Sequence, residues 1–134
     1  MHVLTQVVLV AGGSALGGLL RWGVSAACGR LFGTAFPWGT LLINVSGSVF
    51  LGWFSTLLSQ RYLAGASKWL RPEDLQLLVA VGFTGAYTTF STFEFEADKL
   101  WRDGHGLLSF TYLASSVVFG LAAVRLGILL ARDP

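Results

Sequence analysis

The segment GFTGAYTTFSTFEFE, residues 82–96, places hydroxyl, phenyl and carboxylate groups inside a very apolar chain. Gly82 and Gly85 weaken its helical propensity, and the hydroxyls at positions 88, 89, 91 and 92 can bond to nearby backbone in competition with a helix. We therefore expect a break near residues 85–89. Backbone freed at membrane depth must be buried in protein or line a cavity, and its carbonyls suit a hard cation such as sodium.

Aromatic and acidic groups follow the expected break at a spacing of three. Phe90, Phe93 and Glu96 share one helical face. Phenyl edges carry partial positive charge and can point at an anion. The same spacing also fits ordinary packing, so it does not decide between the two roles.

Two further stretches carry polar stripes. Thr40, Asn44 and Ser48 recur every four residues, and Tyr112 and Ser116 repeat that spacing near Ser109. In lipid such stripes must face protein or water. They predict either hydrogen bonds between helices or the lining of a polar path.

Composition indicates a bilayer as the solvent around these groups. Of 134 residues, 54% are hydrophobic and 12% charged, and the formal charge of +2 is too small and scattered to suggest nucleic-acid binding. Four windows, 1–20, 31–60, 75–93 and 104–124, contain no Asp, Glu, Lys or Arg. Each could cross a hydrocarbon core, which needs about 20 helical residues.

The predicted fold is all-α: four transmembrane helices at about 3–29, 37–60, 73–101 and 106–131, forming one membrane domain over residues 1–134. In the first helix, Gly13 and Gly17 form a GxxxG pair, and Ser14 and Gly18 repeat this spacing, which permits close helix contact. Four helices cannot easily enclose a polar path alone. A homodimer is the simplest closed assembly.

The cations are divided almost equally between the two expected membrane sides. Four lie with the termini and three opposite them: Arg61, Lys68, Arg71 and Arg132 against Arg30, Lys99 and Arg102. This gives almost no orientation signal under the positive-inside rule. Either the small count is noise, or the chain inserts in both orientations.

Together, GTLLINVSGSVFLG and GFTGAYTTFSTFEFE closely resemble the Fluc (CrcB-type) fluoride channel family. The resemblance implies an antiparallel, dual-topology homodimer in the inner (plasma) membrane. It also implies two pores for passive fluoride export and a central structural sodium ion.

The same resemblance implies roles for individual residues. Gly85 and Thr88 look like the sodium-binding carbonyl donors, and Phe90 and Phe93 like the pore phenylalanines. Arg21 and Glu96 resemble charged groups of the vestibule and of the region beyond the phenylalanines. The remaining matches are to polar pore residues: Thr40, Asn44, Ser91, Thr92, Tyr112 and Ser116.

Three other classes compete with a channel. A small dual-topology multidrug or cation transporter would need a carboxylate deep in the first helix, and residues 1–20 contain none. An enzyme would need a nucleophile and base or metal ligands, yet His2 and His105 lie at a terminus and a turn, so we expect no enzymatic activity. A structural bundle would explain the glycines, but not the break, phenyl pair and Asn44 together.

Overall fold

The computed structural model describes residues 3–63 and 71–132, with side chains placed for residues 3–60 and 71–132. Its three long helices are α1 (Val3–Phe32), α2 (Trp38–Leu63) and α6 (Gly106–Arg132). They agree with three of the predicted ranges to within about three residues, and each contains a span long and apolar enough to cross a membrane. The prediction of an all-α, multi-pass membrane protein is confirmed for the described part of the chain.

The segment expected as one interrupted helix, 73–101, forms four helical pieces. They are α3 (Pro72–Leu75), the π-helical η1 (Gln76–Thr84), α4 (Gly85–Tyr87) and α5 (Phe90–Arg102). Pro72 occupies the first turn, where its missing N–H costs nothing. Between α4 and α5 the backbone is extended, with ψ of 159° at Thr88 and 123° at Thr89.

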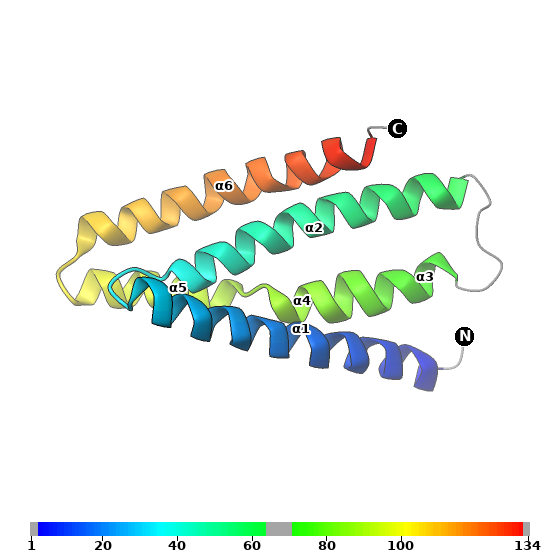
Figure 1. Cartoon of the computed structure of the whole chain (residues 1–134), viewed down its shortest axis with the longest axis horizontal. Helices are drawn as coiled ribbons and strands as arrows, with labels where there is room; N and C mark the ends of the chain where they lie inside the picture. Colours follow the sequence, from blue (N-terminus) through cyan, green and yellow to red (C-terminus); the bar gives the residue numbers. More distant parts are fainter. Residues whose placement is uncertain (1–2, 64–70, 133–134) are drawn as a thin grey trace.

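The helices pack as two pairs (Figure 1). One pair is α1 with η1 and α4, and the other is α2 with α6. α1 begins at the same end of the molecule at which α6 ends. The connection between Phe32 and Trp38 joins the pairs and contains Gly33, whose φ of 76° favours glycine.

Glycines allow both pairs to approach closely. A Cβ added to Gly13 would overlap the Leu78 carbonyl oxygen, and one added to Gly17 would overlap that of Phe83. Gly52 and Gly127 make similar approaches between α2 and α6. Of the predicted small-residue face of the first helix, Gly13 and Gly17 form a contact surface within one chain, whereas a Cβ at Gly18 would meet no atom within 4 Å.

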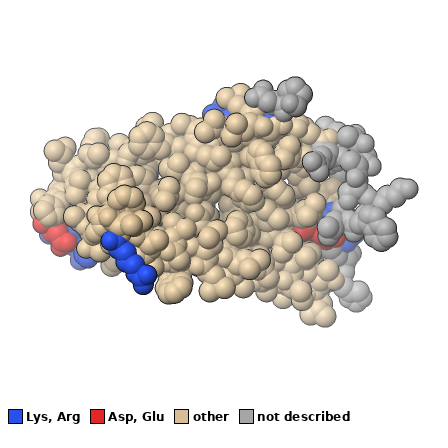
Figure 2. All heavy atoms as spheres, viewed as in Figure 1, with Lys and Arg blue, Asp and Glu red and all other residues tan. Residues whose placement is uncertain are grey.

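The outer surface is largely apolar. Leu4, Trp22 and Leu107 are each more than 70% exposed. On the face drawn in Figure 2, charged side chains gather toward the two ends, a few more blue atoms lie at the upper edge, and most of the remaining surface is uncharged. This pattern fits a molecule surrounded by lipid or by a second membrane protein.

Most of the described cations lie near helix ends, and Arg21 and Arg125 lie inside α1 and α6. Arg30 is in the last turn of α1, Lys99 and Arg102 are in the last turn of α5, and Arg132 is in the last turn of α6. Two cations of the sequence-based charge comparison lie outside the described part of the structure: Lys68, and the side chain of Arg61.

Candidate functional site

The interruption between α4 and α5 is held by a side chain from α2. Asn44 Nδ2 donates to the Thr89 carbonyl oxygen at 2.9 Å, and the Thr89 N–H donates to Asn44 Oδ1 at 2.8 Å. One amide thus satisfies both backbone groups of Thr89, as a neighbouring strand would. Of the two predicted roles for the polar stripe, the structure shows a bond between helices at Asn44.

Two backbone carbonyls at the interruption lose their usual helical partners. The N–H four residues after Gly85 belongs to Thr89 and is directed to Asn44. The N–H four residues after Thr88 belongs to Thr92, and it donates to Thr89 Oγ1 at 3.2 Å as an N-terminal cap of α5. The carbonyls of Gly85 and Thr88, the predicted sodium ligands, therefore need other partners.

The predicted bonding of hydroxyls to nearby backbone is confirmed at two positions, Thr88 and Thr89, whose Oγ1 atoms bond to the Thr84 carbonyl and to the Thr92 N–H. Thr88 Oγ1 donates to the Thr84 carbonyl at 2.9 Å, and Thr89 Oγ1 donates to Thr92 Oγ1 at 3.0 Å. Ser91 and Thr92 are exposed at the start of α5. These local bonds flank the end of α4 and the start of α5, which are two residues apart.

Further contacts hold the interruption against α2. The hydroxyls of Ser46 and Tyr87 are 2.9 Å apart, and the Tyr87 side chain is buried. A Cβ on Gly47 would overlap Thr88 Cγ2. The role of Ser46 was not predicted from the sequence because its partner lies 41 residues away, although a tyrosine beside the expected ion ligands was a signal.

The two predicted pore phenylalanines have different environments. Phe93 is 7% exposed and Phe90 is 69% exposed, with their ring centroids 5.9 Å apart. Phe93 also meets Tyr112 edge to face, at 5.1 Å and 69°. Phe93 thus packs within the chain, whereas Phe90 presents its ring outward.

A polar cluster lies beyond Phe93. Thr40 Oγ1 donates to Glu96 Oε1 at 3.0 Å, and the Tyr112 hydroxyl donates to Glu96 Oε2 at 2.8 Å. Thr40 and Tyr112 are both buried. The structure therefore brings together three predicted site residues from α2, α5 and α6 around one carboxylate.

A cavity of about 160 Å³ adjoins this cluster. Thr40 and Glu96 line it together with residues of the α1–α2 connection, and Ser25 and Gly29 of α1 complete one wall. Arg21 is half-buried and lies one turn before Ser25 in α1. Among the described residues, Arg21 and Glu96 do not form an ion pair.

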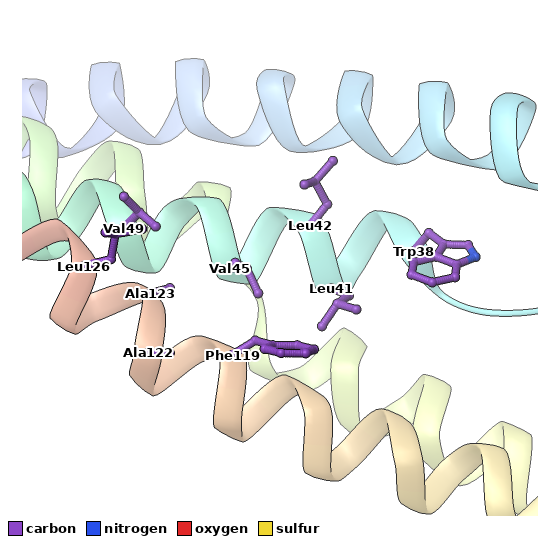
Figure 3. Close-up of a pocket in the computed structure, with 9 residues that line it drawn as sticks. All are labelled: Trp38, Leu41, Leu42, Val45, Val49, Phe119, Ala122, Ala123 and Leu126. Atoms are coloured by element: carbon purple, nitrogen blue, oxygen red, sulfur yellow. The ribbon is translucent and has the colours of Figure 1, made fainter.

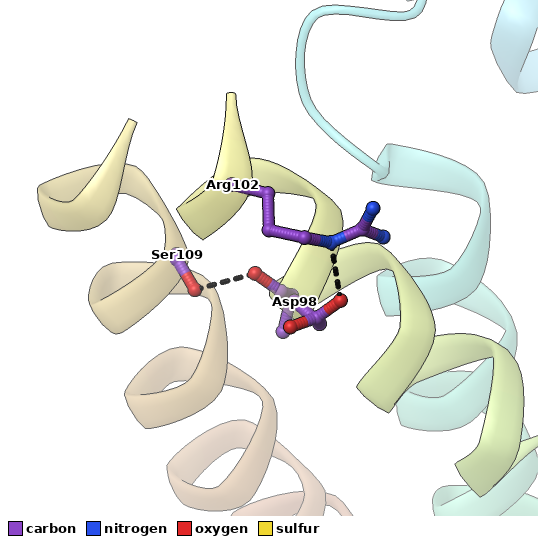
Figure 4. A network of polar contacts seen from close by, with 4 residues as sticks. Asp98, Arg102 and Ser109 are labelled. Carbon is purple, nitrogen blue, oxygen red and sulfur yellow. Dashed lines mark hydrogen bonds and ion pairs between the residues drawn. The ribbon is translucent and has the colours of Figure 1, made fainter. Parts of the chain in front are cut away.

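On α6, the remaining predicted hydroxyls differ in their bonding. Ser109 Oγ donates to the Ala97 carbonyl at 2.7 Å, which fastens α6 to α5 beside the exposed Asp98–Arg102 pair (Figure 4). Ser116 Oγ is buried without a hydrogen-bond partner in the described part of the chain. A buried hydroxyl normally has a hydrogen-bond partner, such as a bound water or a group from another chain.

An apolar groove of about 540 Å³ runs between α2 and α6 (Figure 3). Phe119 of α6 lies beside Leu41 and Val45 of α2 at its centre. Its lining offers little to replace the hydration of an ion. The polar contacts of Asn44 and Glu96 lie outside it.

Comparison with known proteins adds independent information. Residues 8–128 match the family described as CrcB-like protein, Camphor Resistance (CrcB). A protein of Synechococcus sp. named fluoride-specific ion channel FluC is 43% identical over 126 residues, covering 92% of this chain and 89% of that relative. Proteins of the same name from Rhizobium johnstonii and Chloroflexus aurantiacus are 39% and 36% identical over 129 residues, covering 96% of this chain and 98% and 97% of theirs.

Proposed function

This chain belongs to the CrcB-like family, and on that premise we propose that it is a fluoride-selective channel that exports fluoride passively across the inner (plasma) membrane. The observation that carries the proposal is the near full-length identity to proteins named fluoride-specific ion channels. The shared name is that of a channel, which confirms the prediction that the chain is not an enzyme.

The polar groups of the site suit a small, strongly hydrated anion. Fluoride loses water on entering a narrow path, so several close donors must replace that water. Neutral donors at successive levels favour passage, because a fixed cation at the narrowest point would hold the ion too tightly. The hydroxyls of Ser91 and Thr92 and the ring edge of Phe90 face outward near the interruption, where they can meet a passing ion.

Glu96, Thr40 and Tyr112 form a second level of the proposed path. Both hydroxyls donate to the Glu96 carboxylate, and the adjoining cavity has room for water beside it. An anion that approaches would draw these donors away from Glu96. We assign Arg21, one turn from the cavity wall, to attraction of fluoride toward the entrance.

We also propose that sodium binds at the interruption through the carbonyls of Gly85 and Thr88. The donor set fits, because both carbonyls lack their ordinary helical N–H partners and neutral carbonyl oxygens are ligands for hard cations. Bound sodium would supply fixed positive charge near the fluoride path. The chain itself supplies the extended backbone at Thr88 and Thr89 that interrupts the helical bonding of these oxygens.

A second copy of the chain completes this proposal. Gly85, Phe90, Ser91 and Thr92 are exposed in one chain, although an ion path must be covered from lipid. An antiparallel partner would cover this face, supply a second pair of carbonyls to sodium and create two symmetric pores. The unpartnered Ser116 hydroxyl is a further group that such a partner could satisfy.

The test is fluoride efflux from liposomes that contain the purified protein and potassium fluoride. With a potassium ionophore to balance charge, we expect rapid release recorded by a fluoride electrode, equal with and without a proton gradient. Liposomes without protein, and liposomes loaded with chloride, are the controls. Absence of release, or release only when a proton gradient is present, would contradict passive channel activity.

A further inference from the structure

Asn44 lies on the polar stripe of α2, but both ends of its amide are engaged with the backbone of Thr89. We propose that Asn44 is a positioning residue for a cation site, because it accepts the Thr89 N–H, which would otherwise donate to the Gly85 carbonyl in a continuous helix. This inference rests on the sodium site proposed above. It assigns the formation of that site to a side chain that need not touch the cation.

The bonding capacity of the amide supports this role. An asparagine amide has two N–H donors and one carbonyl acceptor. At Asn44 one donor and the acceptor form the reciprocal pair with Thr89, which fixes the plane of the amide. The second N–H remains available in that fixed plane, so the same residue can still face the proposed fluoride path.

Local sequence alone does not keep the Thr89 N–H away from Gly85. Tyr87, Thr88 and Thr89 have only moderately lower helical propensity than alanine, so a helix through them would cost little. Without an acceptor from α2, the Thr89 N–H would be left unpaired or would return to the Gly85 carbonyl. Leaving a part-buried N–H unpaired is costly, so the helical bond would be favoured and a cation ligand lost.

Neighbouring contacts from α2 do not replace this function. Ser46 holds the Tyr87 hydroxyl, and Gly47 makes room for the Thr88 methyl group. Both act on side chains, whereas only the Asn44 amide reaches the two backbone groups of Thr89 among the described contacts. Ser46 and Gly47 therefore pack the interruption against α2, whereas Asn44 keeps the Gly85 carbonyl free of its helical N–H partner.

The experiment measures sodium-dependent thermal stability of the purified protein in sodium chloride and in N-methylglucamine chloride at equal ionic strength. Asn44→Leu keeps the side-chain size but removes the amide, and Asn44→Asp keeps an acceptor for the Thr89 N–H. Ser48→Ala, one turn later on the same stripe, is the matched control. Amide hydrogen exchange at Thr89 is recorded in each variant.

We expect Asn44→Leu to raise the sodium concentration for half-maximal stabilisation about tenfold, equivalent to about 1.4 kcal/mol, and to alter exchange at Thr89. Asn44→Asp should retain a larger sodium response, and Ser48→Ala should match wild type. If Asn44→Leu does not fold, Asn44→Ser, which is too short to span both bonds, replaces it. A wild-type sodium response in the variant lacking the amide, or an equal loss in Ser48→Ala, would overturn the role of Asn44 alone. A wild-type protein without any sodium response would overturn the cation site as well.

Discussion

At the residue scale, the carboxylate of Glu96 is held by two hydroxyls from different helices. Tyr112→Phe removes one of these donors while keeping the buried ring and its edge-to-face contact with Phe93. Because a partly buried carboxylate loses a hydrogen bond, we expect the free energy of unfolding to fall by about 1–3 kcal/mol. Chemical unfolding in detergent measures this change.

The matched control for that prediction is Thr111→Val on the same helix. Thr111 is exposed, and within the described part of the chain its hydroxyl bonds only to the Leu107 carbonyl of its own helix turn. Its removal should change stability by less than about 0.5 kcal/mol. Equal effects of the two substitutions on the free energy of unfolding would show that the hydrogen bond from Tyr112 to Glu96 does not stabilise the protein.

The aromatic edge of Phe93 can be separated from its bulk. In Phe93→Ile, loss of the contact with Tyr112 should cost about 0.5–1.5 kcal/mol of stability, which leaves a folded protein. If the ring edge also replaces fluoride hydration, loss of about 2.8 kcal/mol at the barrier slows flux roughly a hundredfold. Fluoride efflux from liposomes measures this rate.

Phe95→Ile is the control for the ring substitution, since Phe95 lies on the same helix and is 64% exposed. It should transport fluoride at close to the wild-type rate. A chromatographically normal Phe93→Ile protein with wild-type efflux would exclude the ring-edge mechanism. Phe90→Ile should reduce flux by the same argument.

At the element scale, the closeness of α1 to η1 and α4 depends on particular glycines. In Gly17→Ala the new methyl group would overlap the Phe83 carbonyl, so the helices must separate. In Gly18→Ala, one residue later, the methyl group meets no atom within 4 Å. The first substitution should destabilise the protein, whereas the second should be neutral or stabilising by up to about 1 kcal/mol, because alanine is the better helix former.

Thermal unfolding of the two variants in the same detergent measures whether their changes in stability have these opposite signs. Gly13→Ala and Gly12→Ala form a second pair with the same contrast, since Gly13 would meet the Leu78 carbonyl and Gly12 meets nothing. Stabilisation by Gly17→Ala would mean that α1 does not pack this closely on the helical run from Pro72 to Tyr87.

How far the sequence predicts these elements depends on whether the interaction is local. The three long helices followed from hydrophobic length, and the hydroxyl bonds of Thr88 and Thr89 followed from residues within four positions. The bond from Asn44 to Thr89 could not be found in this way, because 45 residues separate them. Sequence analysis indicated only that the Asn44 amide needed a partner.

The Glu96 cluster shows the same limit. Thr40, Glu96 and Tyr112 were each predicted as site residues, but from three different helices and without mutual contacts. Their meeting depends on how α5 lies against α2 and α6, which periodicity does not specify. The π-helical form of η1 was also not predicted, since its apolar residues fit an ordinary helix equally well.

At the scale of the whole molecule, we predict that the chain inserts in both orientations. The described cations lie at both ends, with Arg30 and Arg102 opposite Arg71 and Arg132 in the predicted topology, so neither side is strongly preferred. Two C-terminal reporters, one active only inside the cell and one only outside, should both give signal. Activity of only one would contradict dual insertion.

The control for that experiment is a chain with three lysines added after residue 134. The added charge should hold the C-terminal end in the cytoplasm, so only the inside reporter should remain active. If both reporters stay active in this control, the assay is reporting something other than orientation.

The interruption at Thr88 and Thr89 also brings two helix ends of opposite polarity together. The run from Pro72 ends at Tyr87 with its carbonyls, and α5 begins at Phe90 with its first N–H groups, of which that of Thr92 is capped by Thr89 Oγ1. Aligned peptide dipoles place about half a negative charge at the first end and half a positive charge at the second. One gap of two residues thus favours a cation beside the end of α4 and an anion beside the start of α5, which an unbroken helix could not do partway along its length.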